Sequence, residues 1–301
     1  MVSPELDLVH ELIALTSHTR QGDVAERRLA YDRAQQSFGD LGCPPGETVA
    51  IGECTAEWVR PARPGDPVLL YLHGGSYALG SPASHRHLSA ALGDAAGASV
   101  LALHYRRPPE SPFPAAVQDA VAACRWLPAQ GIPPSHTLLA GDSAGAGLAV
   151  AALQVLRDAR DPLPAAAVCI SPWADLACAG ASHHDRAGRE ILLDTSDLRE
   201  MAERYLAGAD PRHPLASPVH ADLSGLPPLL IQVGTEEVLW DDARGLHAAA
   251  VRAGVPVTFE EWPDMFHVWH WFHPVLPEGR AALAAAGGFL SSAASRASVA
   301  T

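Results

Sequence analysis

Short, almost wholly apolar runs alternate along the chain with longer segments in which apolar positions recur at helical spacing. Strands that are apolar on both faces indicate a parallel sheet that helices cover on its two sides. The fold class predicted is therefore α/β, with a mostly parallel central sheet. We expect strands at Val68–Leu72, Ser99–His104, His136–Ala140, Ala166–Ser171, Pro228–Val233 and Val255–Glu260, after two earlier strand-like segments at Glu47–Cys54 and Glu57–Pro61.

Helical patterns separate these strands and flank them at both ends. Two helices are expected in the first forty residues, near Pro4–Thr16 and Asp23–Phe38. Helices between and after the strands are expected near Ala83–Ala95, Pro114–Leu127, Ala144–Arg157, Trp240–Ala253 and Glu278–Phe289.

One segment breaks the alternation. Between Trp173 and Pro227 there is no clear strand, but a helical pattern covers Thr195–Leu206. A structureless loop of that length is uncommon inside a compact domain, so we expect an insertion over the sheet. The domain organisation predicted is a helical cap formed by residues 1–45 and 176–215, a core formed by residues 46–175 and 216–292, and a disordered tail at residues 293–301.

Composition excludes several classes of function. The formal net charge of −13 argues against nucleic acid and anionic membranes, because both are bound through an excess of basic residues. All 21 basic residues are arginine, which excludes Ser–Lys dyads, Schiff-base lysines and P-loop lysines. The five cysteines are scattered without a Cys-x-x-Cys pair, which argues against a disulfide framework and a zinc site. With neither a signal-peptide pattern nor a run of about 20 apolar residues, we expect a cytoplasmic location.

A Gly-x-Ser-x-Gly pentapeptide lies at Gly141-Asp142-Ser143-Ala144-Gly145. It follows an apolar strand and opens a helix, which is the setting of a nucleophile elbow. The sharp turn would lift the serine oxygen above the sheet, and the two glycines would allow neighbouring backbone to come close. The dipole of the helix would stabilise developing negative charge. Ser143 is therefore the candidate nucleophile.

A His-Gly-Gly motif at His73-Gly74-Gly75 directly follows the strand Val68–Leu72. In lipases and esterases, backbone N–H groups of this loop bind the oxyanion of the tetrahedral intermediate. We expect the donors to be the amides of Gly74, Gly75 and Ala144, and His73 to hold the loop.

The α/β-hydrolase fold presents its triad in the chain order serine, acid, histidine. Carboxylates follow the strand Pro228–Val233, and His267 follows the last strand. The histidine would act as general base and then general acid, with the carboxylate orienting it. His270 and His273 are rival positions for the base. The other paired histidines, His85 with His87 and His183 with His184, are expected at the surface.

The motifs together resemble the bacterial hormone-sensitive-lipase-like esterases, also called family IV esterases, of the α/β-hydrolase fold. The matching segments are His73-Gly74-Gly75, Tyr105 to Ala116, Gly141 to Gly145, Ser171 to Leu176, Glu237 to Asp242, and His267. The resemblance implies that Glu237 is the triad acid, with Glu236 and Asp241 as lesser candidates. The chain departs from the family pattern in having Glu237 and Val238 where Asp and Pro are usual, and Ser76 where a third glycine is frequent.

The resemblance implies a serine carboxylesterase that acts on short- to medium-chain acyl esters without a cofactor or metal. It also implies a cap that shapes the acyl pocket, and a monomer or homodimer. A lactone, amide or carbamate substrate would use the same acyl-transfer centre and stays open. A non-catalytic binding protein on the same scaffold is a further alternative. The presence of Ser143, Glu237 and His267 argues against it.

Overall fold

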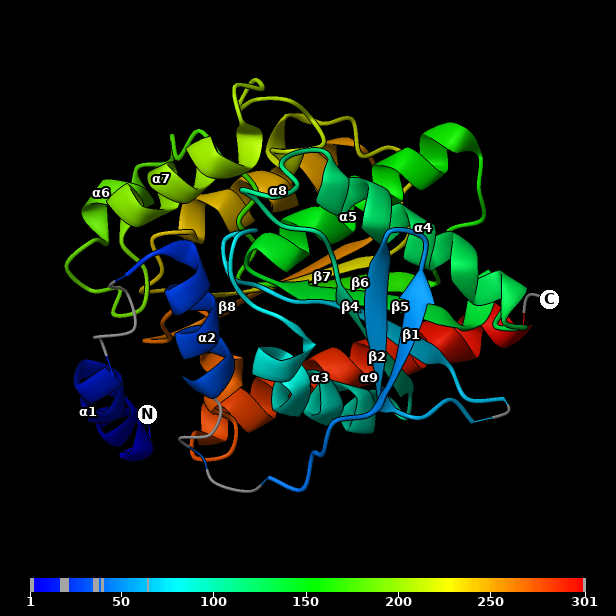
Figure 1. Ribbon diagram of the computed structural model, residues 1–301, viewed down its shortest axis with the longest axis horizontal. Helices are drawn as coiled ribbons and strands as arrows, with labels where there is room; N and C mark the ends of the chain where they lie inside the picture. The colour runs from blue at the N-terminus through cyan, green and yellow to red at the C-terminus, as the bar shows by residue number, and fades with distance from the viewer. Residues whose placement is uncertain (1–2, 17–21, 35–37, 39–40, 64, 300–301) are drawn as a thin grey trace.

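The computed structural model describes residues 3–16, 22–34, 38, 41–63 and 65–299. Within them an eight-stranded sheet runs in the order β1-β2-β4-β3-β5-β6-β7-β8 (Figure 1). The strands β3 to β8 are parallel, and β1 and β2 add an antiparallel edge. Their bounds are Glu47–Ile51, Cys54–Arg60, Val68–Leu72, Ser99–His104, Thr137–Asp142, Ala166–Ile170, Leu229–Gly234 and Val257–Trp262 for β1 to β8.

Helices cover both faces of this sheet, as Figure 1 shows. On one face, α3 (Pro82–Ala96) and α9 (Pro277–Val299) pack together. The other face carries α4 (Ala115–Ala129), α5 (Ala144–Ala159) and α8 (Trp240–Arg252). The strands β3, β5, β6 and β7 are buried along their whole length, which is why their sequences read as continuous apolar runs. The predicted fold class is confirmed.

The remaining helices lie at the carboxyl end of the parallel strands. They are α1 (Glu5–Thr16) and α2 (Val24–Ala34) from the N-terminal region, and α6 (Ser182–Asp185) and α7 (Thr195–Leu206) from the insertion. An ion pair joins the two groups, because Arg27 of α2 lies 2.8 Å from Asp197 of α7. These contacts agree with a cap built from both segments, and the division into cap and core stays a prediction.

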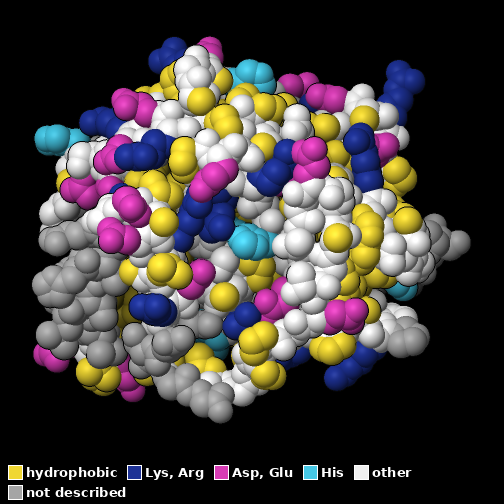
Figure 2. All heavy atoms as spheres, in the orientation of Figure 1, with side chains coloured by type: hydrophobic (Ala, Val, Ile, Leu, Met, Phe, Trp, Pro, Cys, Tyr) yellow, Lys and Arg dark blue, Asp and Glu magenta, His cyan; other side chains and the backbone are white. Residues whose placement is uncertain are grey.

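Three short 3-10 turns complete the described elements, at Pro134–His136, Pro218–His220 and Trp269–Phe272. Within the described ranges, no helix has the length and apolar character needed to cross a membrane. All five cysteines are free, and four of them are buried. On the face drawn in Figure 2, acidic and arginine side chains are interspersed despite the strongly negative net charge.

Two expected boundaries differ from the structure in an informative way. The strand expected to end at Ala140 continues to Asp142, so β5 reaches the residue before the candidate nucleophile. The expectation of a disordered tail from residue 293 is wrong as far as Val299. The helix α9 continues to that residue, and Ala293 and Ala294 are buried. The small residues of this segment suggest a disordered end. Alanine is, however, the strongest helix former, and burial of one face stabilises the helix. Residues 300 and 301 lie outside the described residues, as do residues 35–37 of the second expected helix.

Candidate active site

Ser143 lies at the sharp turn between β5 and α5. Its backbone φ of 55° and ψ of −120° is a strained conformation for a residue with a side chain, and costs about 1–3 kcal/mol. The Ser143 N–H donates to Ile170 O at 2.8 Å, and its carbonyl accepts from the Trp173 N–H at 3.0 Å. Ile170 is the last residue of the neighbouring strand β6, and Trp173 lies in the loop that follows it. The surrounding structure therefore holds the elbow in its strained form.

Close backbone packing explains the glycines around this serine. A Cβ on Gly145 would lie 2.0 Å from Leu72 O, and a Cβ on Gly141 would lie 2.3 Å from Gly145 O. No side chain fits at these distances. Gly145 therefore lets α5 approach β3, and Gly141 lets the turn from β5 into α5 close tightly. The expected elbow is present, with its serine at the carboxyl end of the sheet.

Glu237 and His267 meet at the carboxyl ends of β7 and β8. His267 Nδ1 lies 2.9 Å from Glu237 Oε2, and both side chains are buried. A carboxylate only accepts hydrogen bonds, so Nδ1 carries the proton and Nε2 is left as the acceptor. Burial lowers the pKa of His267. The hydrogen bond and charge of Glu237, with the charges of Glu190 and Asp142, outweigh burial and raise that pKa above its ordinary value.

The second oxygen of Glu237 is fixed as firmly as the first. Its Oε1 accepts from Ser171 Oγ at 2.7 Å and from the Gly234 N–H at 2.6 Å. Ser171 Oγ in turn accepts the Val268 N–H at 3.1 Å, beside the histidine. Ser171 directly follows Ile170, which holds the Ser143 amide. The end of β6 therefore joins the elbow, the acid and the histidine loop in one connected region.

The rival positions lie elsewhere. Glu236 faces Arg189 at 3.3 Å, and Asp241 accepts the Ser182 N–H at 2.9 Å. His270 Nε2 contacts the side-chain oxygen of Gln232 at 2.9 Å, and the ring of His273 stacks on that of His87. The carboxylate in contact with His267 is Glu237, the position that the motif alignment indicates.

Asp142, the residue before the nucleophile, is the centre of a buried network that the sequence did not reveal. It accepts hydrogen bonds from the Tyr71 hydroxyl at 2.7 Å and the Gly74 N–H at 3.0 Å, and His85 Nε2 lies at 3.2 Å. Burial alone would raise the pKa of Asp142, but the charge and hydrogen bond of His85 and the Tyr71 hydroxyl lower it. His85 is 1% exposed, so its expected surface position is wrong. His87 and His183 are buried as well, whereas His184 is exposed.

This network changes the expected set of oxyanion donors. The Gly74 N–H already donates to Asp142, which favours the amides of Gly75 and Ala144 over that of Gly74 as oxyanion donors. Within the described residues, the Gly75 and Ala144 amides have no protein acceptor. Ala144 is the first residue of α5, where the helix dipole adds positive potential. His73 is buried, stacks on Tyr105 and contacts Gly74 O at 2.8 Å, which supports its expected role in holding the loop.

Aromatic side chains line the region beside the elbow. Tyr77, which follows the glycine loop, stacks on Tyr205 of α7 with ring centroids 3.9 Å apart and an interplanar angle of 6°. A Cβ on Gly147 would lie 3.1 Å from the Tyr77 hydroxyl, which places this ring one helical turn from Ser143. In the part of the chain that the structure describes, neither tyrosine hydroxyl has a hydrogen-bond partner.

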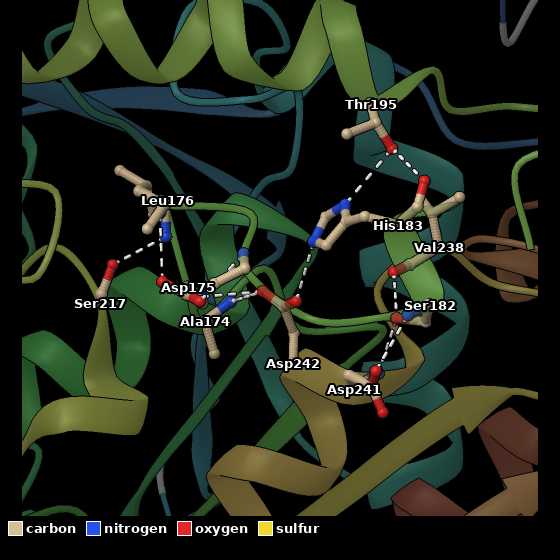
Figure 3. A network of polar contacts seen from close by, with 12 residues as sticks. Ala174, Asp175, Leu176, Ser182, His183, Thr195, Ser217, Val238, Asp241 and Asp242 are labelled. Atoms are coloured by element: carbon tan, nitrogen blue, oxygen red, sulfur yellow. Dashed lines mark hydrogen bonds and ion pairs between the residues drawn. The ribbon is translucent and has the colours of Figure 1, made fainter. Parts of the chain in front are cut away.

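Two carboxylates just after the acid loop fasten the insertion to the core (Figure 3). Asp242 accepts the N–H groups of Ala174 and Asp175 at 3.0 and 2.8 Å, and its other oxygen lies 3.2 Å from His183 Nε2. Asp241 exchanges hydrogen bonds with Ser182. Across the described ranges, no cluster of three or more histidine, cysteine or carboxylate side chains is arranged to hold a metal ion.

Comparisons with known proteins agree with this geometry. A family model described as alpha/beta hydrolase fold matches residues 69–271. An acetyl-hydrolase of Streptomyces hygroscopicus is 76% identical over 97% of this chain and 98% of its own length. A putative acetyl-hydrolase of Mycobacterium tuberculosis, LipR, is 37% identical over 81% of this chain and 79% of its own.

Solved structures are similar over nearly the whole chain. An esterase from the bacterial hormone-sensitive lipase family superimposes with a TM-score of 0.92 at 45% identity, covering 98% of this chain and 99% of its own. The structure of EstE5 soaked with p-nitrophenyl butyrate has a TM-score of 0.90 at 42% identity, covering 97% of this chain and 99% of its own.

Proposed function

Because the chain belongs to the hormone-sensitive-lipase-like esterases of the α/β-hydrolase fold, we propose that it hydrolyses short-chain acyl esters, acetyl esters among them, through an acyl-enzyme on Ser143. The observation that carries this proposal is the His267 Nδ1 to Glu237 Oε2 contact of 2.9 Å beside a strained serine elbow. Such an arrangement activates a serine hydroxyl, whose own pKa is too high for it to be a good nucleophile.

Acylation proceeds in two proton transfers. His267 Nε2 takes the proton of Ser143 Oγ as that oxygen attacks the ester carbonyl carbon. The resulting imidazolium is stabilised by Glu237 through the Nδ1 hydrogen bond. The carbonyl oxygen becomes an oxyanion that the Gly75 and Ala144 amides bind. The carbon–oxygen bond to the alcohol then breaks, and His267 returns the proton to the departing alkoxide.

Deacylation repeats these steps with water. His267 takes a proton from water as the oxygen attacks the acyl carbon, and the bond to Ser143 Oγ breaks as the serine recovers a proton. The products are a carboxylic acid and a free enzyme, so the reaction consumes one water and needs no other reactant. Loss of one oxyanion donor costs about 3–4 kcal/mol of transition-state stabilisation in such sites, which is why the position of the Gly75 loop matters.

The stacked pair of Tyr77 and Tyr205 supports a short acyl group. Tyr77 comes from the loop after β3 and Tyr205 from α7 of the insertion, and their stacked rings lie beside the elbow. Stacked aromatic rings are rigid and fill space close to the nucleophile. We infer that this pair limits the acyl length. A cytoplasmic location and a monomeric or homodimeric state stay predictions from the sequence.

A series of p-nitrophenyl esters tests the proposal. Activity on the acetate and butyrate that falls steeply for the octanoate and longer esters is expected, with negligible activity on p-nitroacetanilide as the amide control. Tyr205→Ala should raise the relative rate on the longer esters. An enzyme that cleaves the anilide as fast as the acetate, or prefers the long esters before any substitution, would contradict the proposal.

A further inference from the structure

A second buried carboxyl lies next to the proposed triad, in the segment between α6 and α7. Glu190 is 7% exposed, and each of its oxygens accepts a backbone N–H. Its Oε1 accepts from Leu192 at 2.7 Å, within the same segment, and its Oε2 accepts from His267 at 3.2 Å, across the sheet edge. The proposed base is therefore held at two points, through its ring by Glu237 and through its backbone by Glu190.

The loop that carries His267 needs such restraint. Val268 adopts φ 49° and ψ 44°, a left-handed conformation that is a genuine outlier for a β-branched residue. Asp264, three residues before the histidine, also has a positive φ of 61°. Strained backbone persists only where the surroundings over-determine it. Three side chains accept backbone N–H groups of this stretch. Thr235 accepts the N–H of Asp264, Glu190 that of His267 and Ser171 that of Val268.

The charge of Glu190 also acts on the histidine. Burial raises the pKa of Glu190 to about 7, with the charge of His267 opposing and that of Glu237 adding to this rise. The Glu190 carboxylate is in turn one of the charges that raise the pKa of His267. The ionisable groups that face this histidine come from every element around it: Glu237 after β7, Asp142 at the end of β5, Glu190 from the insertion and His270 after β8.

We propose that Glu190 is a positioning residue of the esterase reaction, which fixes the His267 backbone from the insertion side and stabilises its imidazolium. This inference rests on the proposed function of His267 as the base. It gives the insertion a part in catalysis besides shaping the acyl pocket, because displacement of the 186–194 segment would release the backbone of the base.

Glu190→Gln tests this directly. The amide has one acceptor oxygen where the carboxylate has two, and it has no charge, so one backbone N–H loses its partner and His267 loses an anionic neighbour. With p-nitrophenyl acetate we expect kcat to fall about 10-fold while KM changes less than about 2-fold. The acid limb of the kcat/KM profile should move to lower pH by up to about half a unit, because the fraction of Glu190 that is ionised near pH 7 no longer favours the imidazolium.

Two further variants distinguish positioning from simple packing. Glu190→Asp keeps the charge but shortens the reach, so its acid limb should stay near that of the parent while kcat falls. Glu200→Gln, an exposed carboxylate of α7 paired with Arg204, should leave both kcat and the acid limb unchanged. Rates are expressed per active site, counted by the amount of phenylmethylsulfonyl label incorporated, so a partly unfolded preparation does not mimic a slower enzyme.

The outcomes separate this inference from the proposed function. If the parent protein lacks esterase activity, the proposed function has failed. If the parent is active and Glu190→Gln has the same kcat per labelled site and the same acid limb, then Glu190 is merely structural and the inference is overturned, whatever the change in melting temperature.

Discussion

The Asp142 carboxylate accepts the Gly74 amide at 3.0 Å, and so ties the residue before the nucleophile to the glycine loop that follows β3. The contact arises because β3 and β5 are neighbours in which Leu72 pairs with Gly141, so the two loops leave the sheet side by side. A Cβ on Gly74 would lie 2.2 Å from Asp142 Oδ2, so the loop reaches this carboxylate as a glycine. The Asp142–Gly74 hydrogen bond therefore fixes the elbow and the proposed oxyanion loop relative to each other.

Asp142→Ala is expected to lower kcat on p-nitrophenyl acetate about 10- to 100-fold with a smaller change in KM, because the Gly74 N–H loses its acceptor and a loosened Gly74 misplaces the Gly75 amide. The melting temperature should also fall. The Gly74 N–H and the Tyr71 hydroxyl both lose their buried acceptor, which costs about 1–3 kcal/mol for each. Asp158→Ala, at an exposed carboxylate of α5, is the matched control. Unchanged kcat in Asp142→Ala would show that the loop keeps its position without this contact.

Glu237→Gln is expected to lower kcat about 10⁴-fold, because the neutral amide stabilises neither the Nδ1–H tautomer nor the imidazolium. Glu236→Gln and Asp241→Asn serve as comparison variants, since these carboxylates contact Arg189 and Ser182 instead of the histidine. Both should retain activity within about 10-fold of the parent. A severe loss in Asp241→Asn with a mild one in Glu237→Gln would reassign the acid.

Gly145→Ala is expected to destabilise the protein severely and abolish activity, because its Cβ would lie 2.0 Å from the Leu72 carbonyl oxygen. Gly288→Ala is the contrasting variant. It lies on the exposed side of α9, where an added Cβ meets nothing within 4 Å, and should raise stability by about 0.5–1 kcal/mol. Thermal melts of both variants check the pair. A Gly145→Ala protein with the parent's melting temperature would contradict the close packing of α5 on β3.

Acid sensitivity should come from buried neutral histidines. Burial lowers the pKa of His270 to about 3, well below the roughly 6.5 of a histidine in the unfolded chain. Between these values the unfolded state binds a proton that the folded state does not. The contribution of His270 to the free energy of unfolding is therefore fully present above about pH 6.5. It decreases by about 1.4 kcal/mol per pH unit as the pH falls toward 3.

His270→Gln should reduce that slope, measured by urea unfolding between pH 6 and pH 4. His184→Gln, at a 94% exposed side chain, should leave the slope as it is. His270→Gln should also retain most of the esterase activity, because this ring contacts Gln232. An unaltered slope in His270→Gln would mean that other groups control acid unfolding.

Short motifs and hydrophobic patterns predict the sheet and the elbow at Ser143. Chain order leaves several carboxylates open as partners of His267. The family resemblance selects Glu237, which is the carboxylate in contact with His267. The contacts of Asp142 with Tyr71 and His85 depend on which strands are neighbours, and no local pattern reveals this. A polar His-Arg-His run looks exposed until α3 is seen to pack against both the sheet and α9.

Glu190 escaped prediction for the same reason. It lies in an irregular segment without periodicity, and one of its two partners is a backbone amide 77 positions away. Residues 293–299 are helical for a different reason. Small residues such as Ala293 both favour a helix and pack closely against their neighbours. Tertiary contacts decided both cases.

Covalent labelling with phenylmethylsulfonyl fluoride, followed by peptide mass spectrometry, tests the central claim most directly. A serine activated by His267 and Glu237 should take up one sulfonyl group on the peptide that contains Ser143, with loss of p-nitrophenyl acetate hydrolysis in step with labelling. Ser143→Ala should be folded, unlabelled and inactive. Label on another residue with activity lost, or substantial hydrolysis by Ser143→Ala, would contradict the assignment of Ser143 as the nucleophile.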